Sequence, residues 1–450
     1  MPSASTFKER FVKNTSIFRF ISSTRILQGM TMSHLHETNF QVQVFSEDGA
    51  EVISNVAWEN GTGFKKSSEE DHENNNQEQR RRELSPIFLP VLRFMKIGGQ
   101  CYGDLSLNES VLHRCIFSRV YCAAVVLGQW FVAMQAVTSL FCEGFAHLTT
   151  FYFLLILSIW YVQSAVVTTT CLFIFPKKPR RPSRFRKFVN NLLAQSSSLR
   201  ISKRSRLGFL LVFACVFCAC NAVCLGFVDL YARSSVTRSC PWNGVFVYRI
   251  IHYIYWAFNA FSWVFPFLLF YVACEILVNL FATLEKKISA ECQNELSIAT
   301  LRKEHLRLCE TVSLADRVFS PILLTTVAMD IPLLCINFHQ GVKSHSLTKD
   351  DITFVISVLY WWIGTATKLT LIMVCGVRVN QKIHGFYNTL QFSNVSEPNE
   401  HFELLHFLMH LRGDSIGMSI GGLAVISKSL ALSLVGVIIS YIAVLVTLPS

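Results

Sequence analysis

Small hydroxyl residues recur at intervals of seven along the last apolar stretch of the chain. Branched apolar residues fall on or beside the same face when the stretch is drawn as a helix. The row consists of Ser433, Val437, Ser440, Val444, Thr447 and Leu448. One interpretation places the row in a bundle core, where the hydroxyls bond to a neighbouring helix or back to a carbonyl four residues earlier.

The other interpretation makes the row the lining of an aqueous pore. Hydroxyl groups keep water against the wall, and a ring of Val or Leu from symmetric copies of the helix closes the pore by dewetting. Because one row encloses nothing, this interpretation requires an oligomer. Its candidate pore and gate residues are Ser440, Val444, Thr447 and Leu448.

Three ionisable residues lie within or at the ends of other apolar stretches: Glu275, Asp330 and Lys368. Burying a charge in lipid is unfavourable, so such residues are candidates for function. Lys368 and Glu275 lie near the predicted cytoplasmic boundary, where their charged ends can reach water. Asp330 lies deeper and must face a cavity, water or a partner, which makes it a candidate for a ligand pocket.

Aromatic residues concentrate in the outer halves of several apolar stretches. Aromatic belts at membrane interfaces look similar, but Trp263, Trp361 and Trp362 lie too deep for a headgroup belt. Clustered aromatic surface with few polar groups suits a small organic ligand. The candidate ligand-binding residues are therefore Tyr152, Trp256, Trp263, Asp330, Trp361 and Trp362.

Three histidines, His401, His406 and His410, share part of one amphipathic segment. Histidines four residues apart can bind zinc or a di-iron centre, which would favour a membrane enzyme. Membrane desaturases and hydroxylases need many such histidines in several clusters, and the sequence offers one cluster. We therefore interpret the histidines as the polar face of a helix packed on its neighbour, with no metal and no cofactor.

Cysteine usage indicates neither a disulfide scaffold nor a metal centre, although the chain has 15 cysteines. Four lie within one apolar stretch, where thiols behave as small hydrophobes: Cys215, Cys218, Cys220 and Cys224. The C-x-x-C spacing in this stretch has no second pair with ligand spacing. Cys142 and Cys240 lie at the predicted outer face and could form one disulfide.

These residues must be positioned by membrane helices. The chain is 51% hydrophobic and 16% charged, whereas soluble domains usually carry about 25% charged residues. Seven runs approach the ~20 apolar residues that span a bilayer. They cover residues 120–142, 148–175, 207–228, 250–274, 318–338, 352–377 and 429–448. None alternates like a barrel strand, so the sequence predicts an all-α membrane protein with seven transmembrane helices.

The distribution of basic residues predicts the orientation, because translocated loops are depleted in Lys and Arg. Loops 176–206, 282–317 and 377–420 hold eleven, six and three basic residues, and the opposite side holds five. We therefore expect a cytoplasmic N-terminus and an extracellular C-terminus. This asymmetry accounts for most of the net charge of +11, so the charge needs no nucleic-acid partner.

Flanking segments complete the predicted organisation. Residues 1–85 are basic at first, then acidic and rich in Asn and Gln, which predicts a largely disordered cytoplasmic arm. Residues 86–450 form the seven-helix domain. Apolar residues recur at helical spacing among charges between the fourth and fifth runs, and again over 399–412, which predicts a cytoplasmic helical anchor domain.

Several stretches resemble the insect and nematode gustatory and odorant receptor superfamily. Its final-helix motif is close to TYxxxLxQF, and "SYIAVLVTL" aligns with it without gaps, with Tyr441 and Leu445 matching. Ser440, Thr447 and Leu448 depart from the motif. "LLHFLMHLRGDSIGMSIGGLAVISKSL" and "PIFLPVLRFMKIGGQCYG" resemble the family's approaches to its last and first helices. The long N-terminal arm and "YWW" are most similar to the nematode branch, which includes light-sensing and peroxide-sensing members.

The resemblance implies a fold, a partner state and a function. It implies four subunits joined by the anchor domain, as a homo- or hetero-tetramer, with a cation pore from four copies of the last helix. Val444 and Leu448 would then form the gate, and Thr447 would meet the ions. We therefore expect a non-enzymatic chemosensory receptor of the plasma membrane that is a ligand-gated cation channel opened by a small molecule. The alternatives are a photoreceptor or peroxide sensor of the same family and a metabotropic seven-helix receptor.

Overall fold

The computed structural model describes most of the chain after residue 87. It covers residues 88–101, 112–143, 148–174, 183–195, 204–235, 246–291, 298–343, 352–391, 398–413 and 416–447. The expectations for the arm 1–85, for Cys240 and for Leu448 lie outside these ranges.

Six helices are long and apolar enough to cross a membrane among the described residues. They are α4 (Leu112–Glu143), α5 (Leu148–Ile174), α8 (Phe246–Glu291), α9 (Ile298–Lys343), α10 (Ile352–His384) and α13 (Lys428–Thr447). Each contains one of the predicted runs or all but its last residue, which confirms a multi-span helical membrane protein. The remaining run, 207–228, lies in α7 (Arg204–Ser235), but the apolar part of α7 is only Gly208–Cys224. Six apolar spans are therefore found among the described residues, and the seventh remains a prediction.

Two helices extend well beyond the predicted runs. α8 and α9 each contain 46 residues, or about 69 Å at 1.5 Å per residue, against a hydrocarbon core of about 30 Å. This confirms the predicted continuation of the fourth and fifth runs as helices. α12 (Pro398–Gly413) confirms the helix predicted over 399–412, and α11 (Phe386–Gln391) and α6 (Arg184–Gln195) are additional short helices.

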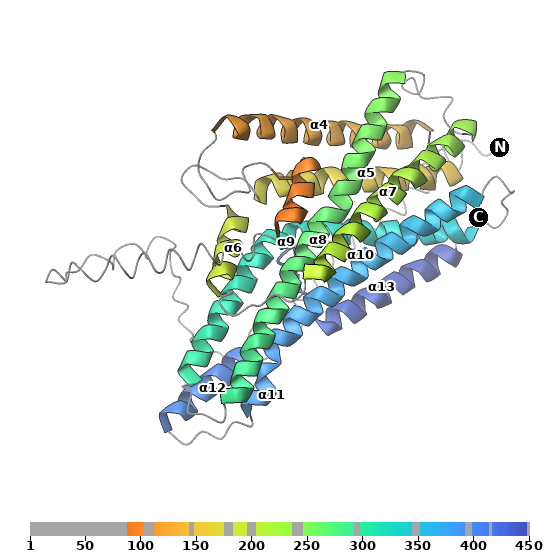
Figure 1. Ribbon diagram of the computed structural model, residues 1–450. Coiled ribbons are helices and arrows are strands. Elements are labelled where there is room, and N and C mark those ends of the chain that lie inside the picture. The colour runs from red at the N-terminus through yellow and green to blue at the C-terminus, as the bar shows by residue number, and fades with distance from the viewer. Residues whose placement is uncertain are drawn as a thin grey trace, which may run out of the picture. The chain divides into compact units, whose positions relative to one another are not determined.

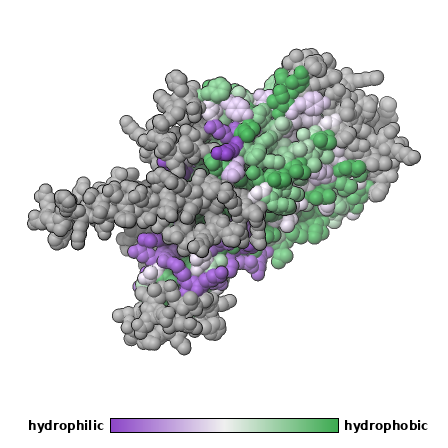
Figure 2. All heavy atoms as spheres, in the orientation of Figure 1, coloured by the Kyte–Doolittle hydropathy of each residue, from purple (hydrophilic) through white to green (hydrophobic). Residues whose placement is uncertain are grey.

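The core is formed where α8, α9 and α10 pack lengthwise against one another, with α5 and α7 at their sides (Figure 1). α4 packs on α5, α12 packs on α9, and α13 lies along α9 and α10. Figure 2 shows hydrophobic residues gathered over the long helices and hydrophilic residues toward the end where α12 lies. Ion pairs at that end include Lys287 with Glu304 and Lys382 with Glu285. This polar end fits the predicted anchor region.

A small β-hairpin lies directly before α13 in this otherwise all-helical membrane protein, and it was not predicted from the sequence. Strands β1 (Ser419–Ile420) and β2 (Ala424–Val425) pair antiparallel. Gly421 and Gly422 have φ of 65° and 71°, the left-handed region that a tight hairpin turn requires and glycine adopts freely. Asp316 in α9 accepts hydrogen bonds from the Ser419 amide and hydroxyl at 2.6 and 2.9 Å. The hairpin is thereby attached to α9 just before α13 begins.

Candidate functional site

A pocket opens among α5, α8, α9 and α10. The empty space between its side chains amounts to about 300 Å³, a volume that includes the open space at its mouth. Its lining consists of Ile156, Leu157, Trp160, Trp263, Leu333, Asn337, Trp361 and Thr365. The wall is therefore mainly apolar and aromatic, with few polar side chains, which is the composition of sites for small organic molecules.

Two of the six predicted ligand-binding residues, Trp263 and Trp361, line this pocket. Trp256 belongs to the same buried aromatic cluster without lining the pocket. Tyr152 instead packs edge-on against His339 at 5.0 Å between ring centres. Trp362 packs on Phe338 at 5.9 Å. Periodicity alone could not separate these residues, because neighbouring positions on one helix point to different partners.

Asn337 was missed by sequence reasoning. It is 1% exposed, and neither atom of its amide has a hydrogen-bond partner among the described residues. A buried amide without partners is unfavourable unless water or a ligand satisfies it. A polar residue inside the predicted run 318–338 was the signal that could have found it. Asn337 gives the pocket one group that can both donate and accept a hydrogen bond.

Asp330 forms a buried ion pair with Lys368. The Oδ2 atom of Asp330 lies 3.0 Å from Nζ of Lys368, and Gln163 Nε2 donates to Oδ1 at 2.8 Å. Asp330 is 0% exposed and Lys368 8% exposed. The interpretation of Lys368 as reaching water at the membrane boundary was therefore wrong. The pair is buried because each charge compensates the other, as charges in membrane helices require.

The ion pair lies next to the pocket without lining it. Nζ of Lys368 lies 4.3 Å from the ring centre of Trp263, which does line the pocket. Cation–π attraction of this kind contributes roughly 0.5–2 kcal/mol. Asp330 is thus connected to the pocket through Lys368 and Trp263. A ligand that moves the Trp263 ring would also disturb the ion pair.

Glu275 also has a partner in a neighbouring helix. It pairs with Arg378 of α10 and is 18% exposed at its side chain. This partly exposed ion pair between α8 and α10 is compatible with the expectation that Glu275 lies near the membrane boundary, which stays a prediction.

Hydroxyl and amide side chains join α4, α5 and α8 in a second network. Gln129 donates to Ser262 at 3.0 Å, and Ser262 bonds Thr168 at 2.6 Å. Thr168 also donates back to the Ser164 carbonyl. Each of the three network residues lies in a different helix, so the sequence alone could not bring them together. The network fixes the side-by-side placement of these helices around the pocket.

α7 is attached to the pocket wall through Trp361. Its Nε1 donates to Asn221 of α7 at 2.9 Å. The neighbouring Tyr360 donates to the Phe217 carbonyl at 2.7 Å, and Phe217 stacks on Trp263 at 5.4 Å. Movement of the pocket tryptophans would therefore be transmitted to α7.

α13 has no buried residue, although it is the most apolar candidate span. Its half-buried residues Leu430, Ala431, Leu434 and Ile438 pack on the core. Ile442 and Leu445 are half-buried as well, continuing this stripe. The described residues of the predicted pore row are exposed: Ser433, Val437, Ser440, Val444 and Thr447. Tyr441 of the motif is also exposed, at 46%.

The hydroxyls of the row bond to their own helix. Ser440 donates to the Gly436 carbonyl at 2.9 Å, and Thr447 donates to the Val444 carbonyl at 2.8 Å. The bundle-core interpretation allowed the hydroxyls to bond either to carbonyls of their own helix or to a neighbouring helix. The first of these two arrangements is present. Packing of the row against another helix of the same chain is not found among the described residues, because the row faces away from α9 and α10.

The three histidines of α12 do not form one cluster. His401 is exposed, and His406 contacts Arg302. His410 instead approaches His305 and Cys309 of α9. The predicted packing of this helix face on its neighbour is confirmed for His406 and His410. The three histidines are not brought together as the alternative of a three-histidine metal centre would require.

The cysteines that the structure describes are free thiols. Cys142 is exposed, and its proposed partner Cys240 lies outside the described residues, so the disulfide stays a prediction. Cys218 in α7 contacts the Ala260 carbonyl at 3.8 Å, which agrees with its interpretation as a small packing residue.

Comparisons with known proteins show what this chain is similar to. A protein-family model described as Trehalose receptor matches residues 213–449, more than half of the 450-residue chain. No curated protein sequence matches the chain. The olfactory receptor OR5 from the insect Machilis hrabei in complex with eugenol is similar, with a TM-score of 0.62 and 13% identity over 82% of this chain and 99% of that receptor. A second structure of OR5 from Machilis hrabei is similar with a TM-score of 0.61 and 14% sequence identity. That match covers 83% of this chain and 99% of that receptor. At these identities the likeness shows a shared fold.

Proposed function

The chain belongs to the trehalose receptor family, and on that premise we propose that it is a gustatory-type receptor that is itself a ligand-gated cation channel. The family is one of receptors, so the chain is not an enzyme. The finer assignment rests above all on one observation, the absence of any buried residue in α13.

The exposed face of α13 supports a pore made by several copies of the chain. A helix that met only lipid would need no polar side chains, yet Ser433 and Ser440 are exposed together with Gly436. Val437 and Val444 alternate with these small residues on the same face. Four copies of α13 around one axis would present alternating hydroxyl and apolar rings to the ions, and the apolar rings would close the pore by dewetting.

The pocket supports a small, mainly apolar stimulus. Trp160, Trp263 and Trp361 offer aromatic walls, while Asn337 and Thr365 offer few polar atoms. A sugar carries many hydroxyls that would each lose water and need a partner. We therefore propose a small aromatic or aliphatic compound with one or two hydrogen-bonding groups, and not a disaccharide, as the ligand of this chain. The eugenol held by OR5 is a small molecule as well.

Orientation and location follow from the charge asymmetry. Twenty basic residues in loops 176–206, 282–317 and 377–420 against five on the opposite side support a cytoplasmic polar end with α12 and an outward-facing end of α13. This orientation requires that α7 completes a seventh crossing. The plasma membrane is the proposed location, since external compounds must reach the pocket.

Current recording in a non-excitable cell tests this function. Small aromatic compounds, trehalose, hydrogen peroxide and short-wavelength light are applied in turn. We expect a cation current with an aromatic or aliphatic compound that persists in an excised patch without nucleotides. A response lost on excision and blocked by G-protein inhibitors would favour a metabotropic receptor. A response to light alone would indicate a photoreceptor, and a response to hydrogen peroxide alone would indicate a peroxide sensor.

A further inference from the structure

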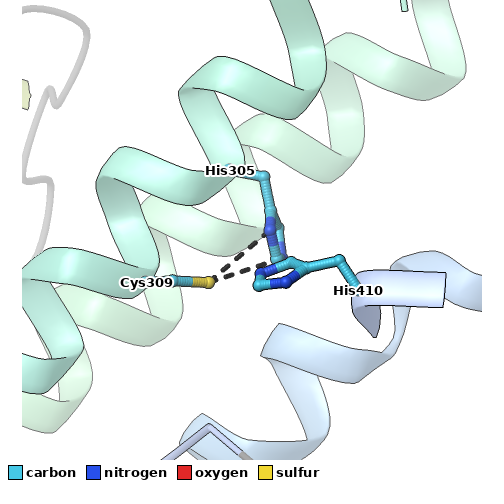
Figure 3. Close-up of side chains that lie close together, drawn as sticks. All are labelled: His305, Cys309 and His410. Atoms are coloured by element: carbon cyan, nitrogen blue, oxygen red, sulfur yellow. Dashed lines mark hydrogen bonds between the residues drawn. The ribbon is translucent and has the colours of Figure 1, made fainter. Parts of the chain in front are cut away.

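Three potential metal ligands lie close together between α9 and α12, and none of them lines the pocket. His305 and Cys309 lie one turn apart on α9, and His410 reaches them from α12 (Figure 3). The ligand atoms of the three side chains all lie within 4.8 Å of one another. His305 is 0% and Cys309 5% exposed. The cluster therefore lies in the packed contact between two elements.

The hydrogen bond of His305 leaves one ring nitrogen available. Its Nε2 lies 3.2 Å from the carbonyl oxygen of Ile383 in α10. A carbonyl only accepts, so Nε2 carries the proton and Nδ1 keeps its lone pair. Metal-binding histidines are commonly held in this way, with the second nitrogen donating to a backbone carbonyl.

The distance between Nδ1 of His305 and Sγ of Cys309 is 3.5 Å. Tetrahedral zinc, with Zn–N of about 2.0–2.1 Å and Zn–S of about 2.3 Å, places such atoms about 3.5 Å apart. Sγ also lies 3.9 Å from Nε2 of the same ring, so the separation of these two α9 groups suits two zinc ligands once the ring turns its Nδ1 lone pair toward the sulfur. The third ligand atom belongs to His410 of α12 and lies within 4.8 Å of the other two.

His410 supplies an unused nitrogen at this point. Its Nε2 is buried and has no hydrogen-bond partner among the described residues. Without a metal, the Cys309 thiol can donate to His305, but the buried nitrogen of His410 gains nothing from that bond. A metal ion satisfies all three groups at once, because it accepts lone pairs from two imidazoles and a thiolate.

We propose that His305, Cys309 and His410 bind one zinc ion that clamps α12 onto α9, with a fourth position for water or another ligand. Imidazole and thiolate together are ligands that zinc prefers among the divalent ions of the cell. On binding, the Cys309 thiol loses its proton to solvent and the sulfur forms the bond to the ion. Because α12 precedes the hairpin and α13, the clamp would fix the cytoplasmic attachment of the last helix.

The test uses the purified full chain, with metal content measured by elemental analysis and with Co²⁺ replacing zinc. We expect one zinc per chain after dialysis and a thiolate-to-cobalt charge-transfer absorption in the Co²⁺ form. Cys309→Ser should abolish that absorption, and both Cys309→Ser and His410→Gln should weaken metal binding at least tenfold. Cys335→Ser, another buried cysteine of α9, and His401→Gln, an exposed histidine of α12, should leave both readouts unchanged.

The wild-type cobalt spectrum keeps the test independent of whether the variants fold. Absence of a thiolate absorption in the wild type, with zinc below one-tenth of an equivalent, would overturn the site. So would Cys309→Ser binding Co²⁺ with an unchanged spectrum. Neither outcome depends on current recording, so the channel proposal and the zinc proposal can fail separately.

Discussion

At the residue scale, the two tryptophans that line the pocket should shape the response to ligand. Trp263→Phe and Trp361→Phe each remove part of an aromatic wall and one indole N–H. We expect the concentration for half-maximal current to rise about tenfold, which corresponds to about 1.4 kcal/mol of lost binding. Dose–response recording measures this shift.

Trp362 provides a matched control for that prediction. It is adjacent to Trp361 in the chain but packs on Phe338 and does not line the pocket. The same replacement, Trp362→Phe, should leave the dose–response curve in place. An equal shift for all three variants would mean that the ligand binds elsewhere and that the substitutions act through general loosening of the bundle.

The buried ion pair of Asp330 and Lys368 should contribute mainly to the stability of the folded protein. Removing one partner leaves a buried charge without compensation, at a cost of roughly 3–5 kcal/mol. We expect Asp330→Asn and Lys368→Met each to lower the melting temperature in detergent markedly. The double variant should recover much of the loss, because no charge remains buried. Single variants as stable as the wild type would show that water reaches the pair.

At the element scale, the exposed face of α13 should act as the gate. Val444→Ser places a hydroxyl in the apolar ring, where it retains water. A shift of about 1.4 kcal/mol toward the open state would raise the basal open probability about tenfold, which appears as current without stimulus. Whole-cell recording in the absence of ligand measures it.

Val446→Ser is the matched control, since it makes the same change on an exposed residue nearly opposite Val444 around the helix. It should leave the basal current at the wild-type level. Leak of equal size in both variants would mean that α13 responds to any added hydroxyl, and the gate would have to lie elsewhere.

The elements could be predicted from the sequence much better than the contacts between them. Runs of about 20 apolar residues mark spans because lipid leaves a helix no alternative, and six of seven were confirmed. The hairpin was missed even though Gly421 and Gly422 between apolar residues are a turn signal. The partner of Lys368 could not be predicted, because it depends on how α9 and α10 are rotated against each other.

At the scale of the whole molecule, orientation can be checked independently of function. Epitopes placed before Met1 and after Ser450 should differ in access on intact cells, with only the second one stained. The reason is the excess of basic residues in the loops assigned to the cytoplasm. Staining of the first epitope alone would reverse the orientation, and staining of both would mean that one of the apolar helices, such as α7, does not cross.

The central claim is that the chain itself conducts through a pore lined by α13. Purified Val444→Cys protein in a planar bilayer, with no other protein present, tests it most directly. We predict that an activating ligand opens a cation current and that a charged, water-soluble thiol reagent then blocks it irreversibly, while Val446→Cys protein stays unblocked. Two results would contradict a pore lined by α13. One is a bilayer that does not conduct with a ligand that activates the chain in cells, and the other is a Val444→Cys current that the reagent leaves unchanged.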